Sequence, residues 1–251
     1  MKHSRLKILS FPILLTLTSC QSNFAWYEIS PMTKAGRSNL SFLIDGYIDT
    51  ISLSLTAIFT SVMLGLFVSL CGYSKVKLVN RLSRFYIVIF RAVPIMALVL
   101  WVFYGLPIFW GINLGPFASG VLSLALSDAA FEAEIFRAGI QSVPLGQKEA
   151  AKSIGLNKWQ IYKLVIIPQA IRKILPALAN QFIYVLKMSA IVSVIGLTEL
   201  TKKANELVVT TYRPLEIYSV LIIEYLILIV FISWIFHRLE NKLRANSLKY
   251  G

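Results

Sequence analysis

The sequence predicts an all-α integral membrane protein with five transmembrane helices, and three observations lead to this prediction. Of the 251 residues, 57% are hydrophobic and only 15% are charged, whereas a soluble domain usually carries about 25% charged residues. The mean hydropathy is +0.69. Crossing a bilayer takes about 20 mainly apolar residues, and five segments meet this need. They are approximately residues 47–72, 85–110, 117–135, 174–197 and 215–236.

The composition also argues against several classes of function. The net charge is +13, from 25 basic and 12 acidic residues. In a membrane chain the basic residues are expected on the cytoplasmic loops, so the charge does not indicate nucleic-acid binding. The two cysteines show no CxxC spacing and the two histidines lie near the ends, so no metal site is predicted. The pattern GxxxxGK[ST] is absent from the sequence, and we expect no cofactor in this chain.

The N-terminal residues 1–20 have the pattern of a signal peptide. Basic residues precede a short apolar core and then small residues, and the core is too short to span a bilayer. The ending LTSC resembles the lipobox of bacterial lipoproteins, which predicts lipidation of Cys20; an uncleaved anchor is the alternative. Residues 21–42 are predicted to form an extracytoplasmic linker, 43–243 the transmembrane domain and 244–251 a cytoplasmic tail.

The basic residues predict how the chain is oriented. If the loop after the first segment lies inside and the sides then alternate, 15 basic residues fall inside and 5 outside. Positive residues accumulate on the cytoplasmic side, so we expect the N-terminus outside and the C-terminus inside in a bacterial cytoplasmic membrane. The inside set is Lys75, Lys77, Arg81, Arg84, Arg137, Lys148, Lys152, Lys158, Lys163, Arg172, Lys173, Arg238, Lys242, Arg244 and Lys249.

The longest cytoplasmic loop, residues 140–173 between the third and fourth segments, has helical signals of its own. Pro144 can begin a helix, and Gly155 can end it in a left-handed cap. Asn157 can cap a second helix, with Gln160 as its capping-box partner, and Pro168 is expected to end or kink that helix. The pattern therefore predicts two short helices joined at a glycine, with a small-residue face on which a partner docks.

Within this loop, EAAKSIGLNKWQIYKLVIIPQAIRKILP (residues 149–176) resembles the EAA loop of permease subunits of binding-protein-dependent ABC importers. Three further stretches resemble the polar amino-acid branch: FRAVPIM (90–96), AAFEAEIFRAGIQSVPLGQKEAA (129–151) and LPALANQFIYVLKMSAIVSVIGLTEL (175–200). The resemblance covers about residues 43–243. Departures are Ala92-Val93 for Gly-Thr, Ala138 for glycine, and KMSAI (187–191) for KDTSL, which puts the substrate class in doubt.

The resemblance implies that the loop holds a coupling helix, which sits in a cleft of a separate ATP-binding subunit that carries ATP and Mg²⁺. Further implied partners are an extracytoplasmic solute-binding protein and a second permease subunit, identical or related, besides membrane lipid. Glu149 would place a carboxylate at the cleft, Ala150 and Ala151 would permit close approach, and Gly155 would permit the turn. The coupling residues implied are Gly146, Glu149, Ala150, Ala151, Ile154, Gly155 and Pro168.

Charged and polar residues inside spans are costly and usually functional. Asp128 and Glu132 share one face of the third segment by i,i+4 spacing, and Glu134 and Arg137 are predicted to form a structural pair. Lys187 is expected to face the pathway, to snorkel, or to pair with Asp128 or Glu132. The candidates for the translocation pathway are Asp128, Glu132, Asn180, Lys187 and Ser189.

The resulting hypothesis is an importer subunit, not an enzyme, for a polar amino acid or a similar small solute. One alternative is an ion-coupled secondary transporter that uses Asp128, Glu132 and Lys187, and another is an ABC permease for a solute of a different class. A membrane enzyme lacks a nucleophile motif, and a lipid-anchored scaffold leaves the EAA pattern unexplained. The outer loop TELTKKANELVVTTYRP (198–214) is either a docking surface for the binding protein or a solvated loop.

Overall fold

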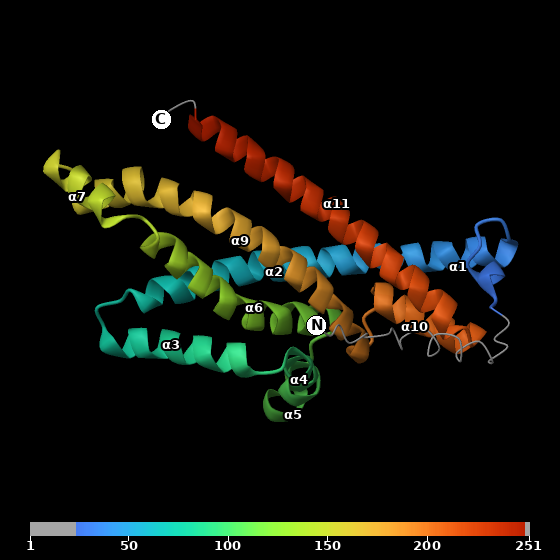
Figure 1. Ribbon diagram of the computed structural model, residues 1–251. Coiled ribbons are helices and arrows are strands. Elements are labelled where there is room, and N and C mark those ends of the chain that lie inside the picture. Colours follow the sequence, from blue (N-terminus) through green and yellow to red (C-terminus); the bar gives the residue numbers. More distant parts are fainter. Residues whose placement is uncertain (1–23, 249–251) are drawn as a thin grey trace, which may run out of the picture.

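The computed structural model describes residues 24–248, with side chains described up to residue 238. Every regular element in this range is a helix (Figure 1), so the predicted all-α class is confirmed for the described part of the chain. The predicted signal peptide 1–20 and the lipidation of Cys20 lie outside the described residues. The predicted tail 244–251 lies partly outside them, because the last helix runs on to Leu248.

Ten α-helices of at least five residues, one α-helix of three residues and four 3₁₀- or π-helical stretches make up the regular structure of the described chain. Residues Trp26–Glu28 and Ser189–Ile195 are 3₁₀-helical, and Trp101–Gly105 and Ile161–Ile166 are π-helical. A three-residue helix, α8, spans Lys158–Gln160. The others are α1 Lys34–Ile44, α2 Gly46–Gly72, α3 Lys77–Ala92, α4 Ile95–Leu100, α5 Leu106–Trp110, α6 Pro116–Gln141, α7 Leu145–Ser153, α9 Ile167–Met188, α10 Leu200–Thr211 and α11 Pro214–Leu248.

The structure supports several membrane spans but not the exact count of five. Within the described residues, three helical segments are long and apolar enough to cross a bilayer: Lys34–Gly72, Lys158–Ile195 and Pro214–Arg238. A bent pair, described below, adds a fourth. Helix α6 has 26 residues, which is long enough, but it does not qualify by hydropathy because it carries serines and charged side chains.

The second predicted segment, residues 85–110, is not one straight helix but is sharply bent near its start. The helical pieces Lys77–Ala92 and Ile95–Trp110 meet at an angle of 103°. Val93 is extended, with φ −72° and ψ 127°, because a residue before proline is disfavoured in the α region. Pro94 thus turns the chain so sharply that α4 and α5 project sideways from the bundle (Figure 1).

The centre of the bundle is the contact between α2 and α6, which is more extensive than any other helix pair in the described chain. Small residues permit it: a Cβ atom at Gly65 would lie 2.8 Å from Glu132 Cβ and 3.0 Å from the Ala129 oxygen. Ala57 and Ala129 are completely buried. Small residues let membrane helices approach closely and gain van der Waals contact. The contact between α2 and α6, here called the seam, encloses the buried polar side chains Ser61, Asp128 and Glu132.

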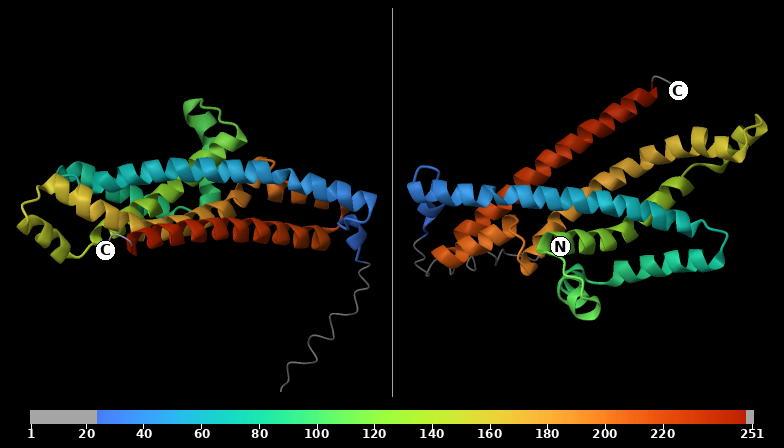
Figure 2. Two further views of the ribbon diagram at one scale, coloured as in Figure 1. Left: turned by 90° about the horizontal axis from the view of Figure 1, so that it is seen from above. Right: turned by 180° about the vertical axis from the view of Figure 1, so that it is seen from behind.

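The two ends of the bundle differ. Helices α1 and α10 contact each other at one end, whereas α7 forms the tip of the other end, toward which α11 also runs (Figures 1 and 2). Helix α1 lies largely within the range predicted as a linker, residues 21–42. The Thr33 hydroxyl caps it by accepting a 3.0 Å hydrogen bond from the Gly36 N–H, and Ala25 N donates to Glu216 Oε1 at 2.7 Å. This segment is therefore folded onto α11 and α10.

Candidate functional site

Helix α7 is a short helix that projects from the tip of the bundle (Figure 1). It begins at Leu145, directly after Pro144, and ends at Ser153, so the predicted start at Pro144 is confirmed. Gly155 follows with φ +82°, and its N–H donates to the Lys152 oxygen at 3.0 Å. Glycine adopts this left-handed conformation without steric cost, which confirms the predicted cap.

The chain then re-enters a helix through the predicted capping box. Asn157 Oδ1 accepts a hydrogen bond from Gln160 N, and Gln160 Oε1 accepts one from Asn157 N, both at 2.9 Å. Two N–H groups that the helix start would leave unpaired are thereby satisfied. The turn between Gly155 and Asn157 is thus defined by local sequence on both sides.

The helix that follows is not short, which corrects the expectation of two short helices. Helix α8 continues through the π-helical turn Ile161–Ile166 into α9, so that Lys158–Ile195 is one long helical segment. Pro168, expected to end or kink this helix, lies in the first turn of α9. Proline is tolerated in the first turn of a helix, where its missing N–H costs no hydrogen bond. The π-helical turn Ile161–Ile166 changes the hydrogen-bond register directly before α9, so Pro168 lies in a first turn although the helical segment is continuous.

The expected docking face of α7 is divided between the bundle and the surface. Ala151 is buried, whereas Glu149, Ala150 and Ile154 are exposed, Ile154 to 77%. A Cβ atom at Gly146 would meet nothing within 4 Å. The exposed surface of α7 and of the residue that follows it therefore includes two small residues, Gly146 and Ala150, together with the Glu149 carboxylate and the Ile154 side chain.

The base of α7 is fastened to both α6 and α9. Val143, Ile166, Ala170 and Ile174 form one buried apolar cluster, and Lys173 Nζ donates a 2.8 Å hydrogen bond to the Ser142 oxygen. Packed cores shift as units rather than deform continuously. A push on α7 would therefore be passed to the ends of α6 and α9.

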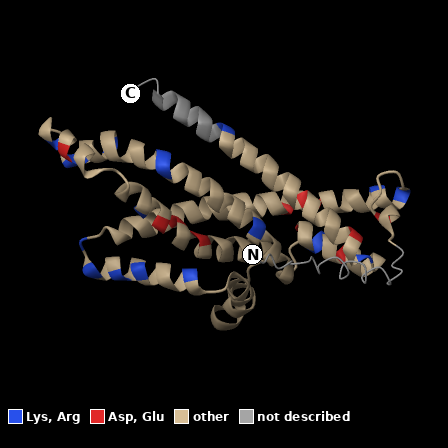
Figure 3. Cartoon of the chain, in the orientation of Figure 1, with Lys and Arg blue, Asp and Glu red and all other residues tan. Residues whose placement is uncertain are grey.

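A second group of functional candidates lies in the middle of the bundle, where Asp128 of α6 joins three helices. Asp128 Oδ2 accepts a 2.9 Å hydrogen bond from Ser61 Oγ of α2, and Asp128 Oδ1 accepts one from Gln181 Nε2 of α9. In Figure 3 the ribbon of α6 carries red segments, the colour of Asp and Glu, in this region. The carboxylate thus binds α2, α6 and α9 to one point.

Glu132 lies one turn further along α6 and is completely buried. Neither of its carboxylate oxygens has a hydrogen-bond partner among the described residues, and Gly65 of α2 packs against its Cβ. An isolated buried carboxylate is costly unless it is protonated or meets a cation. Glu132 is therefore a group that this conformation leaves unsatisfied.

The other predicted pathway residues do not join this cluster. Asn180 is exposed and lines a hollow of about 440 Å³ between α9 and α11. Lys187 is exposed and forms no ion pair with a described residue, including Asp128 and Glu132. Ser189 is buried, and its hydroxyl donates to the Leu186 oxygen at 2.7 Å within the same helical segment. The structure therefore brings Asp128 and Glu132 together with Ser61 and Gln181 instead.

The predicted pair Glu134–Arg137 is present and has a third member. Arg137 Nη2 lies 2.5 Å from Glu134 Oε1, and Arg91 Nη1 of α3 lies 2.9 Å from Glu134 Oε2. Arg91 also lies over the Phe131 ring, 5.2 Å from its centroid. Arg91 therefore ties the end of α3 to α6.

One buried carboxylate, Glu199, was not predicted from the sequence. It caps α10 by accepting a 2.8 Å hydrogen bond from Lys202 N, and it accepts a 2.9 Å bond from the Tyr225 hydroxyl of α11. Burial raises the pKa of the Glu199 carboxyl above its usual value, and these hydrogen bonds oppose the rise. Its place directly before an amphipathic helix was the available signal. The outer loop 198–214 is thus largely helix α10. Glu199 caps its start, and Ala204 and Leu207 on its buried face pack in an apolar cluster.

Comparisons with known proteins identify a family and several relatives of this chain. Residues 42–245 match the family described as "Binding-protein-dependent transport system inner membrane component". The arginine transport system permease protein ArtQ of Bacillus subtilis (strain 168) is 33% identical over 83% of this chain and 95% of that protein. The glutamine transport system permease protein GlnP of Escherichia coli (strain K12) is 31% identical over 88% and 98%.

A crystal structure of an amino acid ABC transporter with histidines shares the fold as well as the sequence pattern. It superimposes with a TM-score of 0.78 and 39% identity, and the match covers 82% of this chain and 96% of that chain. Among the described residues, no group of three or more His, Cys, Asp or Glu side chains is placed to hold a metal ion.

Proposed function

The chain belongs to the family of binding-protein-dependent transport system inner membrane components, and on this premise we propose that it is the permease subunit of an ATP-driven importer for a polar amino acid or a similar small solute. Members of this family are multi-pass membrane subunits without chemistry of their own, and a separate subunit hydrolyses ATP. The family match over residues 42–245 carries this proposal, and relatives named for arginine and glutamine transport support the solute class.

The proposed assembly contains this permease, a second identical or related permease, ATP-binding subunits that hold ATP and Mg²⁺, and an extracytoplasmic solute-binding protein. The chain is proposed to cross the membrane five times, with the bent pair and α6 counted as spans, its N-terminus outside and its C-terminus inside. The charge distribution supports this orientation. So does the placement of α7 and the end of α11 toward one end and of α1 toward the other (Figure 2).

Coupling is proposed to run through α7. Its exposed face, with Glu149, Ala150 and Ile154, enters a cleft of the ATP-binding subunit. Closure of that subunit pair on ATP moves α7, and the buried cluster at its base transmits the movement to α6 and α9. The left-handed turn at Gly155 holds α7 at an angle to the long helix that follows.

The solute pathway is proposed to pass the seam that contains Asp128 and Glu132, since α6 and α9 are the two helices that α7 moves. In the present conformation Glu132 is enclosed against Gly65, with no space for a solute. Movement of α6 relative to α2 would expose its carboxylate to a protonated amino group. Asn180 and Lys187, both exposed on α9, remain pathway candidates only if a second permease subunit completes a channel there, and buried Ser189 only if the helices around it separate.

The experiment that tests this function compares two energy sources. Membrane vesicles that contain the permease, its ATP-binding subunit and its binding protein should accumulate a labelled polar amino acid when given ATP. Omission of the ATP-binding subunit should abolish accumulation, and an ionophore should leave it intact. Accumulation that persists without the ATP-binding subunit and collapses with the ionophore would instead establish an ion-coupled secondary transporter.

A further inference from the structure

The turn between α2 and α3 and the first half of α3 form a strongly basic surface. Four basic side chains, together with Ser74 and Asn80, line one hollow of about 370 Å³. All four are exposed, and none forms an ion pair with another described residue. The four, here called the basic hollow, are Lys75, Lys77, Arg81 and Arg84. Four uncompensated cations around one concavity attract an anion.

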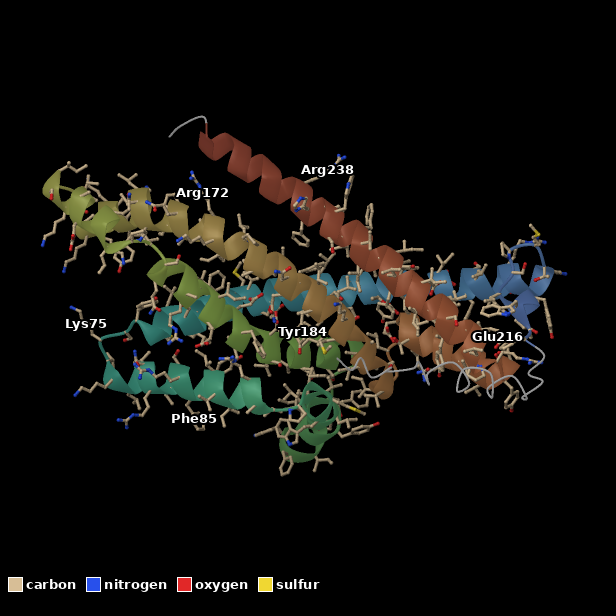
Figure 4. The ribbon with its side chains drawn as sticks, viewed as in Figure 1. Lys75, Phe85, Arg172, Tyr184, Glu216 and Arg238 are labelled. Atoms are coloured by element: carbon tan, nitrogen blue, oxygen red, sulfur yellow. The ribbon has the colours of Figure 1, made fainter. Side chains whose placement is uncertain are left out.

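The spacing along α3 shows what kind of anion fits. Residues four apart lie on the same face of a helix, so Phe85 follows Arg81 and Val88 follows Arg84 on the same side. Phe85 is 64% and Val88 66% exposed, and Phe85 lies on the side of α3 that faces away from the bundle, whereas Lys75 stands at the turn (Figure 4). Along this side of α3, the exposed basic side chains Arg81 and Arg84 are thus followed within about one helical turn by the exposed apolar side chains Phe85 and Val88.

The level of the hollow along the bundle points to the membrane surface. Both orientations of the ribbon show α7 projecting beyond the α2–α3 turn at the same end (Figures 1 and 2). The basic hollow therefore lies between the tip that faces a soluble partner and the apolar middle of the bundle. Blue ribbon segments, the colour of Lys and Arg, follow α3 from the turn toward the middle (Figure 3). A phosphate next to hydrocarbon chains is what a phospholipid offers at this depth.

We propose that the basic hollow binds the phosphate of an anionic phospholipid whose acyl chain lies along Phe85 and Val88. The arginines Arg81 and Arg84 supply planar guanidinium groups that hold phosphate oxygens bidentately, and Lys75 and Lys77 add charge. The bound lipid would fasten the start of α3 to the membrane surface, at the end of this helix opposite the 103° break that separates α3 from α4. This site is independent of the proposed transport function.

The test measures lipid retained by the purified permease in complex with its ATP-binding subunit. The complex is reconstituted in phosphatidylcholine with a minor share of phosphatidylglycerol, released gently, and weighed by native mass spectrometry. Each basic residue near an anionic surface strengthens attraction by roughly fivefold. The double variant Arg81→Gln/Arg84→Gln should therefore retain phosphatidylglycerol on the order of twentyfold less well than the wild type.

Two further variants control for charge and for fold. Lys152→Gln/Arg172→Gln removes two exposed charges from the same end of the molecule and should retain phosphatidylglycerol as the wild type does. Arg81→Lys/Arg84→Lys keeps the charge but loses the bidentate geometry, so its retention should lie between that of the glutamine variant and that of the wild type. Equal loss in the Lys152/Arg172 variant would show a nonspecific effect of net charge and would overturn the proposal, as would unchanged retention in the Arg81/Arg84 glutamine variant.

Two outcomes would assign the hollow to another ligand. Glycerophosphoglycerol, the headgroup without acyl chains, should not displace the lipid at equal concentration; if it does, the apolar surface takes no part and the lipid site is wrong. Assembly with the ATP-binding subunit in lipid-free detergent should be unaffected by Arg81→Gln/Arg84→Gln. If assembly fails there, the hollow is a protein contact and the proposal falls.

Discussion

Ser61 of α2 and Asp128 of α6 are joined by a 2.9 Å hydrogen bond in the centre of the bundle. The same carboxylate accepts a bond from Gln181 of α9, so one side chain fixes the relative positions of the three helices that surround the polar seam. Only α6 and α9 continue from this point to the base of α7. The Asp128 contact is therefore where movement from the tip would first separate one helix from another.

Removal of the Ser61 hydroxyl should weaken this junction measurably. Hydrogen bonds between membrane helices contribute about 1 kcal/mol, so Ser61→Ala should lower the free energy of unfolding in mixed micelles by about that amount. Asp128→Ala loses both bonds and leaves Gln181 unpaired, for a loss of roughly 2–3 kcal/mol. Thr60→Ala is the matched control, because the exposed Thr60 hydroxyl bonds only to the Thr56 oxygen of its own helix. Equal effects of the Ser61 and Thr60 changes would contradict the role of the junction.

A single methyl group at Gly65 should separate α2 from α6. The added Cβ would lie 2.8 Å from Glu132 Cβ and 3.0 Å from the Ala129 oxygen, and overpacking of this kind costs about 1–3 kcal/mol. Gly65→Ala should lower the midpoint of thermal unfolding in detergent and reduce ATP-driven uptake. Gly72→Ala, on the same helix, places its Cβ at an ordinary 3.4 Å from Ser83 Oγ and should fold as the wild type does. A Gly65→Ala protein as stable as the Gly72→Ala protein would show that α2 and α6 are not tightly packed at Gly65.

Gly155 should tolerate asparagine better than alanine. At φ +82° a left-handed backbone costs an ordinary L-residue roughly 1–2 kcal/mol, and asparagine visits that region more readily. Gly155→Ala should insert into the membrane normally but lose most ATP-driven uptake, whereas Gly155→Asn should retain a substantial part of it. The measurement is uptake in vesicles, normalised to the amount of inserted permease. Normal uptake by Gly155→Ala would mean that the angle of α7 does not matter.

Glu199 should make stability depend on pH. Because burial raises the pKa of its carboxyl in the folded protein, the folded state holds the proton more tightly than the unfolded state. The contribution of Glu199 is therefore largest below its unfolded pKa, about 4.3, and it falls as the pH rises through the interval up to the folded pKa. Unfolding of wild type and Glu199→Gln, compared at several pH values, should show this decline only in the wild type.

The control for this pH dependence is Glu206→Gln, on the half-exposed side of α10. This change leaves Glu199 and its bonds to Lys202 N and Tyr225 in place. Its unfolding curves should follow the wild type across the same pH range. Identical pH dependence of wild type and Glu199→Gln would show that Glu199 is not the group that titrates.

Local signals in the sequence predicted local structure well. The start of α7 at Pro144, its end at Gly155 and the Asn157–Gln160 capping box each depend on residues within one turn, and each is confirmed. The prediction that Pro168 ends or kinks its helix was wrong, because the effect of a proline depends on the helix geometry around it. Here a π-helical turn and the long α9 that follows allow the helix to continue.

Relationships across the bundle were harder to predict. Asn180 and Gln181 are neighbours in sequence, but a helix rotates about 100° per residue, and only its packing decides which side chain meets Asp128. The partner is Gln181. Lys187 offered a plausible ion pair for Asp128, yet it lies exposed on α9. The i,i+3 pair Glu134–Arg137 was predictable from spacing, whereas the bond from Arg91 depends on how α3 packs against α6.

The central claim is that α7 receives the movement of the ATP-binding subunit, and cross-linking tests it most directly. Ile154, exposed to 77% on the outer face of α7, would be changed to cysteine in a permease that has no other cysteine, and a set of single cysteines would line the cleft of the ATP-binding subunit. Ile154→Cys should form a disulfide with the cleft, and its yield should change when ATP is bound. Arg172→Cys, exposed on α9 (Figure 4), should form none. Absence of any cross-link from Ile154→Cys, in a complex that still transports with ATP, would contradict the account.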